Sequence, residues 1–540
     1  MRLWLGALTR SSLALALFLS MNASARSQSF SPASVAEDDV VLRGTVVSSV
    51  DKTPIRSALV QLLGEKPRAM LTGADGSFQF EGLAAGDATI SVRKPGYFSP
   101  QEYYPESIGE RVVHLAPNLV PIELKLYPEA VIFGRATNEN GRPLEGLTVQ
   151  LVPTGTKNSA RKLEDLPNTL TNENGEYRLA ELHAGTYLVS ASRKMNANGP
   201  IAFFQASKLS HGYPTYFYPN VTDSSLATPV RITPGKQVQA DLRLTMQPLF
   251  RISGTVQGIS AGAPVVVVMV GQNDVEPVAA SVVAPGLNGF VLEGVPAGSY
   301  FLGALQAGPG DSVGEKTGIT RVEVTENREG VSIVLAGKKT IPMRYRFEST
   351  QPNGNVAQDP GVSVSFERTD LAPEAGLFTE TYVPGRSEIS LDPGTYRAKI
   401  NAATNRCVAS IRSGGTDIVA EDLVVTAAGP VEPVELVVRD DCGRVQGSIT
   451  KDGQPAMGRV FLIPESEPRR GISTAANSDG KFEFQGLLPG SYFAVALDGA
   501  DDLDPENPEA LKAQRGRATK VEVQPSAEVS VSLELKSLEP

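Results

Sequence analysis

Tryptophan, histidine and cysteine are scarce in this chain of 540 residues, and each shortage argues against a class of function. The one tryptophan is Trp4, close to the N-terminus, which weakens the case for a tryptophan-lined lectin site. None of the three histidines has another histidine within four positions, as the helical zinc sites of many peptidases require. Two cysteines alone do not make a metal site. We therefore expect a protein that is not an enzyme and that needs no cofactor.

Clusters of basic residues are also missing. The chain has 50 Lys and Arg against 60 Asp and Glu, which gives a formal net charge of −10. This acidity, without concentrated positive charge, argues against binding to nucleic acid or to anionic lipid surfaces.

The first residues have the pattern of an export signal. Positive charge precedes the apolar stretch Leu13 to Leu19, and Ala23-Ser24-Ala25 fits an A-x-A cleavage site. The stretch is too short to cross a bilayer, which takes about 20 apolar residues, and the C-terminus has no apolar anchor. We expect residues 1–25 to be a signal peptide and 26–37 a loose leader. The mature chain is then exported to the periplasm, the cell surface or the medium, without a transmembrane anchor.

A turn pattern occurs four times along the chain. An Asp-Gly or Asn-Gly pair precedes an aromatic residue, and a glycine follows that aromatic residue eight positions later. The aromatic residues are Phe78, Tyr177, Phe290 and Phe482, and the glycines are Gly86, Gly185, Gly298 and Gly490. Asp-Gly and Asn-Gly pairs favour hairpin turns, because these turns need positive φ. Short strands between such turns predict β-sandwiches, so the chain is expected to be all-β.

The repeats divide the mature chain into about five modules. Their expected bounds are 38–126, 127–246, 247–337, 338–440 and 441–540. The second carries an aromatic-rich insertion at 196–225, and the fourth is degenerate because it lacks the Asp-Gly-Phe turn. In the third, the apolar run Val265 to Val270 fits a central strand buried on both faces. Helix signals are nearly absent, and only Pro508 to Gln514 fits a short helical turn.

The repeated motif resembles that of a known family. It reads Gly-x-Val, then Pro-Ile or Pro-Leu, then Asp-Gly-x-Phe-x-Phe-x-Gly-Leu-x-x-Gly-x-Tyr, and its last part is clearest at Asp479 to Tyr492. This pattern resembles the carboxypeptidase regulatory-like domain, strongly in the first, second and fifth modules, moderately in the third and weakly in the fourth. The resemblance implies a tandem array of transthyretin-like (prealbumin-like) β-sandwiches, a fold placed near the carbohydrate-binding-like folds. It also implies an exported bacterial protein without catalytic activity, because such domains accompany peptidases without performing their chemistry.

The aromatic insertion is the first candidate ligand site. Its candidate residues are Tyr213, Tyr216, Tyr218, Asn220 and Asp223. Aromatic rings could stack on the C–H faces of sugars while the amide and the carboxylate meet hydroxyls. The alternative is that these rings cap the end of their own sandwich, and Tyr103-Tyr104-Pro105 in a corresponding place favours this structural role.

Two smaller sets of residues remain. Asp498, Asp501, Asp502 and Asp504, with Glu506, could form an oxygen-rich calcium site, or else a solvated acidic loop without the glycine of an EF-hand. Cys407 and Cys442 could form a disulfide in an oxidising compartment, the alternative being two buried thiols. His183 lies in a turn position and is expected to face solvent.

Three functions are compatible with these features. The first is a non-catalytic binding or scaffold protein of the bacterial cell envelope, with a protein or glycan as its partner. The second is a carbohydrate-binding protein that uses the loop from Tyr213 to Asn220. The third is an accessory or remnant subunit of an envelope peptidase or outer-membrane receptor.

Overall fold

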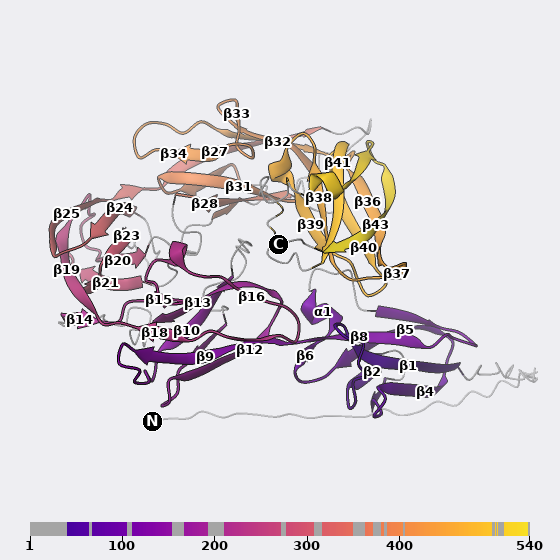
Figure 1. Cartoon of the computed structure of the whole chain (residues 1–540). Coiled ribbons are helices and arrows are strands. Elements are labelled where there is room, and N and C mark those ends of the chain that lie inside the picture. The colour runs from indigo at the N-terminus through magenta and orange to yellow at the C-terminus, as the bar shows by residue number, and fades with distance from the viewer. Residues whose placement is uncertain are drawn as a thin grey trace, which may run out of the picture.

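The structure is a computed structural model, and it is built almost entirely of β-strands (Figure 1). The residues it describes are 40–63, 67–104, 111–153, 167–192, 210–271, 277–306, 316–348, 362–370, 380–382, 386–402, 406–498, 503, 505, 512 and 514–537. The expected signal peptide and leader, and nearly all of the Pro508 to Gln514 segment, lie outside these ranges. The strands gather around five hydrophobic cores in series, so the expected all-β tandem array of β-sandwich modules is confirmed.

Module 1, from β1 to β8, is a sandwich of two sheets. The first sheet contains, in spatial order, β4 (Ser77–Leu83), β1 (Val40–Ser48), β8 (Ile122–Pro128) and β6 (Tyr97–Phe98). The second contains β3 (Arg68–Leu71), β2 (Leu59–Leu63), β5 (Gly86–Arg93) and β7 (Arg111–Leu115). Alternate residues of β1 and β4 are buried, as the two-residue period of a strand requires, and they form the core between the sheets.

Module 2, from β9 to β18, repeats this plan. One layer contains β12 (Glu176–Leu182), β9 (Ala130–Asn138), β17 (Gln237–Gln239) and β18 (Leu242–Leu244). The other contains β11 (Asn168–Leu170), β10 (Thr148–Pro153), β13 (Gly185–Ser192), β15 (Tyr216–Phe217) and β16 (Val230–Ile232). A short 3-10 helix, η2 (Ser224–Leu226), follows β15.

Module 3, from β19 to β26, borrows a strand from its neighbour. Its first sheet contains β14 (His211–Gly212), β19 (Gln247–Gln257), β22 (Gly289–Pro296) and β25 (Arg328–Val334). The second contains β21 (Pro277–Val283), β20 (Val265–Gly271), β23 (Gly298–Gln306), β24 (Lys316–Val324) and β26 (Ala336–Gly337). β20 is central, but only every second residue is buried, so the expectation of burial on both faces is wrong.

Modules 4 and 5 vary the plan. Module 4 packs β30 (Glu388–Leu391), β27 (Lys339–Glu348), β35 (Val434–Arg439), β32 (Cys407–Ser413) and β33 (Thr416–Asp417) against β29 (Glu380–Tyr382), β28 (Val362–Arg368), β31 (Gly394–Ala402) and β34 (Leu423–Val425). Module 5 joins β37 (Gln454–Pro455), β36 (Gly443–Lys451), β43 (Glu528–Ser537), β41 (Gly490–Asp498), β38 (Arg459–Pro464), β39 (Ile472–Ala475), β40 (Lys481–Leu487) and β42 (Thr519–Val523) in one sheet. That sheet is continuous because β43 pairs with both β36 and β41, so its two halves enclose one core.

The Asp-Gly and Asn-Gly turns are present, but the expected hairpins are wrong. Gly76 has φ +72°, the left-handed geometry that glycine adopts without strain. The turn nevertheless leads from β3 in one sheet to β4 in the other, and among the described strands β4 pairs with β1 rather than with β3. The same holds for Gly175, between β11 and β12. These turns therefore connect the two layers of a sandwich.

A glycine in the first strand faces an aromatic ring in four of the modules. The pairs are Gly44 with Phe78, Gly134 with Tyr177, Gly254 with Phe290, and Gly447 with Phe482. A Cβ on Gly447 would lie 2.1 Å from the Val531 carbonyl oxygen and 2.6 Å from the Phe482 ring. Only a glycine in β36 lets the Phe482 ring and the parallel strand β43 approach the backbone so closely. Module 4 has Ile341 opposite Ile389 in this region, which explains why its sequence looks degenerate.

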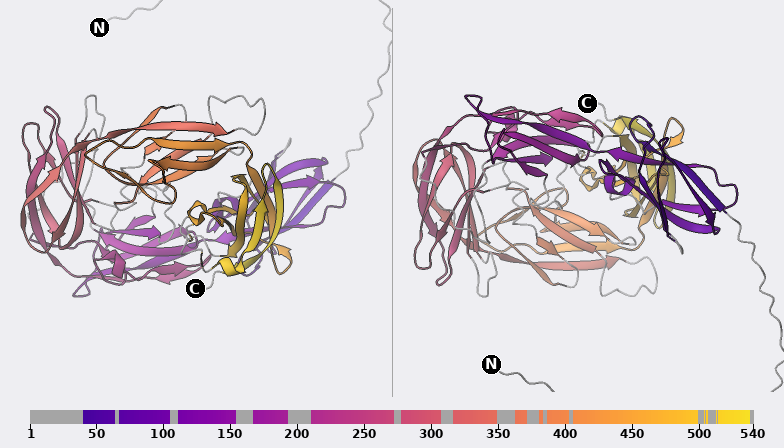
Figure 2. Two further views of the ribbon diagram at one scale, coloured as in Figure 1. Left: turned by 90° about the horizontal axis from the view of Figure 1, so that it is seen from above. Right: turned by 90° about the horizontal axis from the view of Figure 1, so that it is seen from below.

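Modules 2 to 5 follow one another around a ring, and module 1 lies against modules 2 and 5 (Figure 2). Modules 2 and 3 share the pairing of β14 with β19. At the next joint the buried Thr317 hydroxyl donates a hydrogen bond of 2.7 Å to Asp392 Oδ1. Modules 4 and 5 are joined by a disulfide between Cys407 and Cys442.

The first and last modules also touch. The Tyr127 hydroxyl, at the end of β8, donates a hydrogen bond of 2.9 Å to Met457 Sδ in module 5. Arg111 of module 1 forms an ion pair of 3.7 Å with Asp479. One buried cluster joins Tyr103, Tyr104 and Tyr127 of module 1 with Met457 and Ala475 of module 5. This contact closes the ring.

Candidate functional site

The aromatic insertion of module 2 is largely engaged in its own module. Residues 196–209 lie outside the described ranges. Tyr216 is 4% exposed and belongs to the module 2 core. Its hydroxyl donates to the Thr245 carbonyl at 2.8 Å and accepts from Gln247 Nε2 at 3.2 Å. Its ring is therefore buried, and its hydroxyl is already hydrogen-bonded next to the joint with module 3.

The other four insertion residues have local roles as well. Tyr213 and Tyr218 are partly buried and pack against the same core. Asn220 Oδ1 accepts the Arg243 backbone N–H at 2.6 Å. Asp223 Oδ1 accepts from the backbone N–H and the hydroxyl of Ser225, and so caps η2. The structure thus gives all five candidate residues contacts that stabilise the module.

The acidic loop of module 5 is only partly described. Asp498 Oδ2 accepts a hydrogen bond of 3.0 Å from Lys451 Nζ. Asp501, Asp502, Asp504 and Glu506 lie outside the described residues. Within the described ranges, no group of three or more His, Cys, Asp or Glu side chains could hold a metal ion. The calcium site stays a prediction.

The three histidines make three different contacts. His114 Nδ1 lies 2.7 Å from Asp87 Oδ1 on an exposed surface, and His211 Nδ1 lies 3.1 Å from the Ser210 hydroxyl. The expectation that His183 faces solvent is wrong, because its ring stacks on Phe98 at 4.3 Å. His183 is therefore part of the packing between modules 1 and 2.

One serine has the sequence context of a hydrolase nucleophile. Residues 258–262 read Gly-Ile-Ser-Ala-Gly, which fits G-x-S-x-G. In a nucleophile elbow this motif links a strand to a helix. Here it links β19 to β20, and the side chain of Gln306 bonds both the N–H and the carbonyl of Ser260. The segment is a loop of the module 3 sandwich and lacks the elbow's geometry.

The joint of modules 1, 2 and 5 is the largest aromatic cluster among the described residues. Tyr103 stacks on Tyr127 at 4.4 Å, and Tyr104 meets Tyr127 edge-on at 5.8 Å. A four-residue helix, α1 (Pro100–Tyr103), ends with Tyr103, and Tyr104 is its C-cap residue. A capping box holds it, in which Ser99 Oγ accepts the Glu102 N–H and the Glu102 carboxylate accepts the Ser99 N–H.

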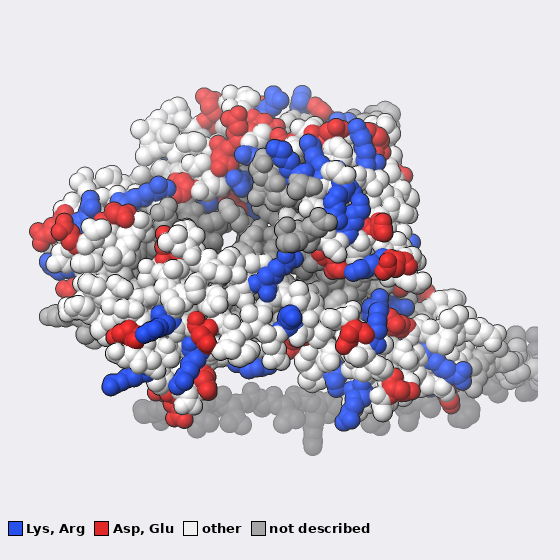
Figure 3. Space-filling model, in the orientation of Figure 1, with Lys and Arg blue, Asp and Glu red and all other residues white. Residues whose placement is uncertain are grey.

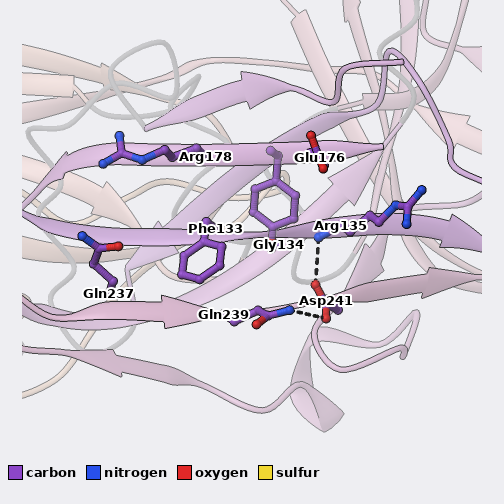
Figure 4. Close-up of a pocket in the computed structure, with 9 residues that line it drawn as sticks. Phe133, Gly134, Arg135, Glu176, Arg178, Gln237, Gln239 and Asp241 are labelled. Atoms are coloured by element: carbon purple, nitrogen blue, oxygen red, sulfur yellow. Dashed lines mark hydrogen bonds between the residues drawn. The ribbon is translucent and has the colours of Figure 1, made fainter. Parts of the chain in front are cut away.

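A shallow depression of about 450 Å³ lies on the outer face of the sheet that contains β12, β9 and β17 (Figure 4). Because side chains alternate along β9, Phe133 and Arg135 point outward while Ile132 and Ala136 enter the core. Arg178 of β12 lies opposite Phe133, and Gln237 and Gln239 of β17 complete the lining, with Glu176 and Asp241 at its edge.

Hydrogen bonds fix one side of this depression. Asp241 Oδ1 accepts the Arg135 backbone N–H at 2.9 Å, and its Oδ2 accepts from Gln239 Nε2 at 2.7 Å (Figure 4). Beneath the sheet, the Tyr177 hydroxyl donates to the Ala240 carbonyl. Burial, with Asp241 nearby, raises the pKa of Tyr177 well above its usual value, so this phenol stays a donor. No residue of this depression was among the sites expected from the sequence, although Phe133 next to the strand glycine Gly134 was a readable signal.

The surface charge is mixed. Acidic and basic side chains are interspersed over the face shown in Figure 3. The described part of the chain contains no helix with the length and apolar character needed to cross a membrane.

Comparison with known families locates two of the modules. Residues 41–106 and 131–245 match the carboxypeptidase regulatory-like domain. The chain carries two copies of that domain. The first match covers module 1 from β1 to α1 and ends before β7 and β8, and the second covers nearly all of module 2. The depression lies on the second. Modules 3 and 5 share their glycine and aromatic pairing.

No curated protein matches this sequence. Among solved structures, the minor pilin of Streptococcus agalactiae is 16% identical, with a TM-score of 0.21, over 39% of this chain and 97% of the pilin. Two B repeat units of the collagen-binding protein of Staphylococcus aureus are 11% identical, with a TM-score of 0.12, over 75% of this chain and 100% of the repeats. Alignments at these TM-scores do not support a shared function.

Proposed function

We propose that this chain is an exported, non-catalytic scaffold of the bacterial cell envelope, whose five β-sandwich modules are held in one closed ring. The contact of Tyr127 with Met457, between the first and last modules, is the observation that carries the proposal. A string of independent modules would not bury aromatic surface between its two ends. The export pattern at residues 1–25 and the two regulatory-like domains support an envelope location without enzymatic activity.

Contacts at the other joints support a rigid ring. The disulfide between Cys407 and Cys442 holds the joint of modules 4 and 5. Across the same joint, Arg470 of module 5 reaches into module 4 and donates a hydrogen bond of 2.6 Å to the Val408 carbonyl. Burial lowers the pKa of Arg470, and Asp417 and Glu467 counter this effect, so the guanidinium keeps its charge. A rigid frame of this kind suits a protein that holds a partner, protein or glycan, at a fixed position.

Small-angle X-ray scattering of the mature chain tests the closed ring. We expect a compact particle, and a larger radius of gyration in Met457→Glu, because a buried carboxylate cannot stay unpaired beside Tyr127. Val120→Glu, at an exposed site in module 1, is the matched control and should leave the scattering unchanged. An elongated wild-type particle would contradict the closed ring, as would Met457→Glu with the profile of the control.

A further inference from the structure

Four modules have a glycine in their first strand that faces an aromatic ring. The outward-facing residue just before this glycine differs among the four. It is Arg43 in module 1, Phe133 in module 2, Ser253 in module 3 and Gln446 in module 5. Arg43 donates to Gln79 Oε1 at 2.8 Å, and Gln446 donates to the Glu528 carboxylate. The side chains of Arg43 and Gln446 thus bond to neighbouring strands. Phe133 instead presents a half-buried aromatic ring on the outer face.

Two polar side chains beside Phe133, Arg178 and Gln237, make no hydrogen bond to any residue that the structure describes. The positive charge of Arg178 does act on the Glu129 carboxylate, where it opposes the effect of burial on the pKa of Glu129. Gln239 commits its Nε2 to Asp241, which leaves its carbonyl oxygen as an acceptor. The depression therefore offers an aromatic face, donors on Arg178 and Gln237, and acceptors on the carbonyl oxygens of Gln237 and Gln239.

The charges in the depression balance. Its lining has two arginines, Arg135 and Arg178, and two carboxylates, Glu176 and Asp241. Arg135 Nε donates to the Asn174 carbonyl, and Glu176 Oε2 accepts from Asn172 Nδ2 at 3.1 Å. A strongly charged ligand of either sign would lie near lining residues that carry the same charge and repel it. An uncharged ligand rich in hydroxyl groups therefore fits best.

Size and shape narrow the ligand class. A volume of about 450 Å³ falls in the range of small-ligand pockets, roughly 300–1,000 Å³. A pyranose ring has an apolar C–H face that can stack on Phe133, and its hydroxyls both donate and accept hydrogen bonds. The depression lies on the outer face of a sheet, so a sugar chain can continue beyond it.

We propose that the depression formed by Phe133, Arg178, Gln237 and Gln239 binds an uncharged pyranose unit of an extended glycan. The site lies within module 2 alone, so it goes beyond the scaffold function and does not depend on ring closure. It differs from the Tyr213 to Asn220 loop, whose aromatic residues pack on the module's own core.

The test uses the mature chain and defined oligosaccharides. Cellohexaose, maltohexaose, mannohexaose and chitohexaose are the neutral probes, tetragalacturonate is the acidic probe, and binding is measured by titration calorimetry. We expect at least one neutral probe to bind, and Phe133→Ala to weaken it about tenfold or more, because the stacking face is lost. Gln237→Ala should weaken binding less.

Matched variants separate the outcomes. Arg43→Ala, at the equivalent position of module 1, should change the affinity less than twofold. Met457→Glu should keep the affinity even if it opens the ring, which separates this proposal from the scaffold function. Circular dichroism of Phe133→Ala must match the wild type, and Phe133→Leu, which keeps an apolar side chain, must also bind weakly if stacking is the cause. The proposal fails if no neutral probe binds, if tetragalacturonate binds better than all of them, or if Phe133→Ala binds like Arg43→Ala.

Discussion

The glycine of the first strand offers the sharpest stability test, and Gly447→Ala in β36 is the variant of choice. The added Cβ would lie 2.1 Å from the Val531 carbonyl oxygen and 2.6 Å from Phe482 Cζ. Val531 belongs to β43, which pairs with β36 in parallel, so its carbonyl cannot retreat without disturbing the ladder. Phe482 is 2% exposed and packs in the module 5 core, so its ring can move aside only by displacing core neighbours.

The magnitude follows from two opposing effects. Overpacking a core by one methyl group costs about 1–3 kcal/mol, and a rigid backbone neighbour places this site near the upper end, at about 3 kcal/mol. Alanine also restricts the unfolded chain, which returns about 0.4–1 kcal/mol. We therefore expect module 5 to lose about 2 kcal/mol of its free energy of unfolding. Amides of β36 and β40 that exchange through opening of the module should then exchange about 30-fold faster.

Hydrogen exchange followed by mass spectrometry measures this effect module by module. Gly516→Ala is the control in the same module, because no atom lies within 4 Å of its added Cβ and its φ is not in the left-handed region. The control should stay within about 0.5 kcal/mol of the wild type. If Gly447→Ala exchanges no faster than Gly516→Ala, the close approach is not the reason for glycine in the first strand.

Two further perturbations test module 5 and its joint. Reduction of the disulfide between Cys407 and Cys442 opens a link across 35 positions and should lower the free energy of unfolding by about 4 kcal/mol on the chain-entropy model. Calorimetry with and without reductant measures this loss. The variant with both Cys407→Ala and Cys442→Ala is the control, and its stability should not depend on the reductant. Two titratable thiols in the unreduced protein would contradict the disulfide. Burial raises the pKa of Tyr492 from 10.0 to about 12, and its hydroxyl donates to the Leu488 carbonyl at 2.7 Å. Between pH 10 and 12 the unfolded state loses this proton and the folded state keeps it, so the stability present below pH 10 falls across that window. The free energy of unfolding, measured by urea denaturation from pH 9 to 12, should decrease less steeply with pH in Tyr492→Phe than in the wild type. Equal slopes in the two proteins would count against a raised pKa of Tyr492.

The all-β fold could be predicted from the sequence because turn residues and the alternation of apolar and polar residues are local signals. Gly76 and Gly175 adopt the positive φ that their Asp-Gly and Asn-Gly pairs predict. The same signals do not specify which strands pair across a turn, since that depends on which layer each strand joins. This is why a hairpin was expected where the chain crosses from β3 to β4. The helix α1 had a readable signal, Ser99-Pro100 followed by Glu102, which is a capping box.

The contacts between modules could not be predicted from the sequence. His183 stacks on Phe98, and Tyr127 bonds to Met457, 330 positions away. No periodicity relates such residues, because their proximity follows from how whole modules are arranged. The tyrosines of the insertion show a related limit. Their spacing does not say which rings face solvent, and Tyr216 lies in the module 2 core with its hydroxyl bonded to the Thr245 carbonyl. Phe133 was not predicted as a site residue, although its position next to Gly134 in β9 is enough to place it on the outer face of the sheet.

The closing contact of the ring is small, and it can still hold because the other joints are in place. Arg111 and Asp479 are partly exposed, and such ion pairs contribute about 0–1 kcal/mol. Two free modules joined only by this pair and the Tyr127 cluster would associate weakly. Within one chain, module 5 is already held near module 1 by the four preceding joints, so the second encounter is intramolecular at an effective concentration of about millimolar or more. The stiffness of the joints at Thr317 and Cys407 therefore decides whether the ring is closed. By this reasoning, loosening the 4–5 joint by reduction should enlarge the particle in scattering even though no residue of the closing contact is changed.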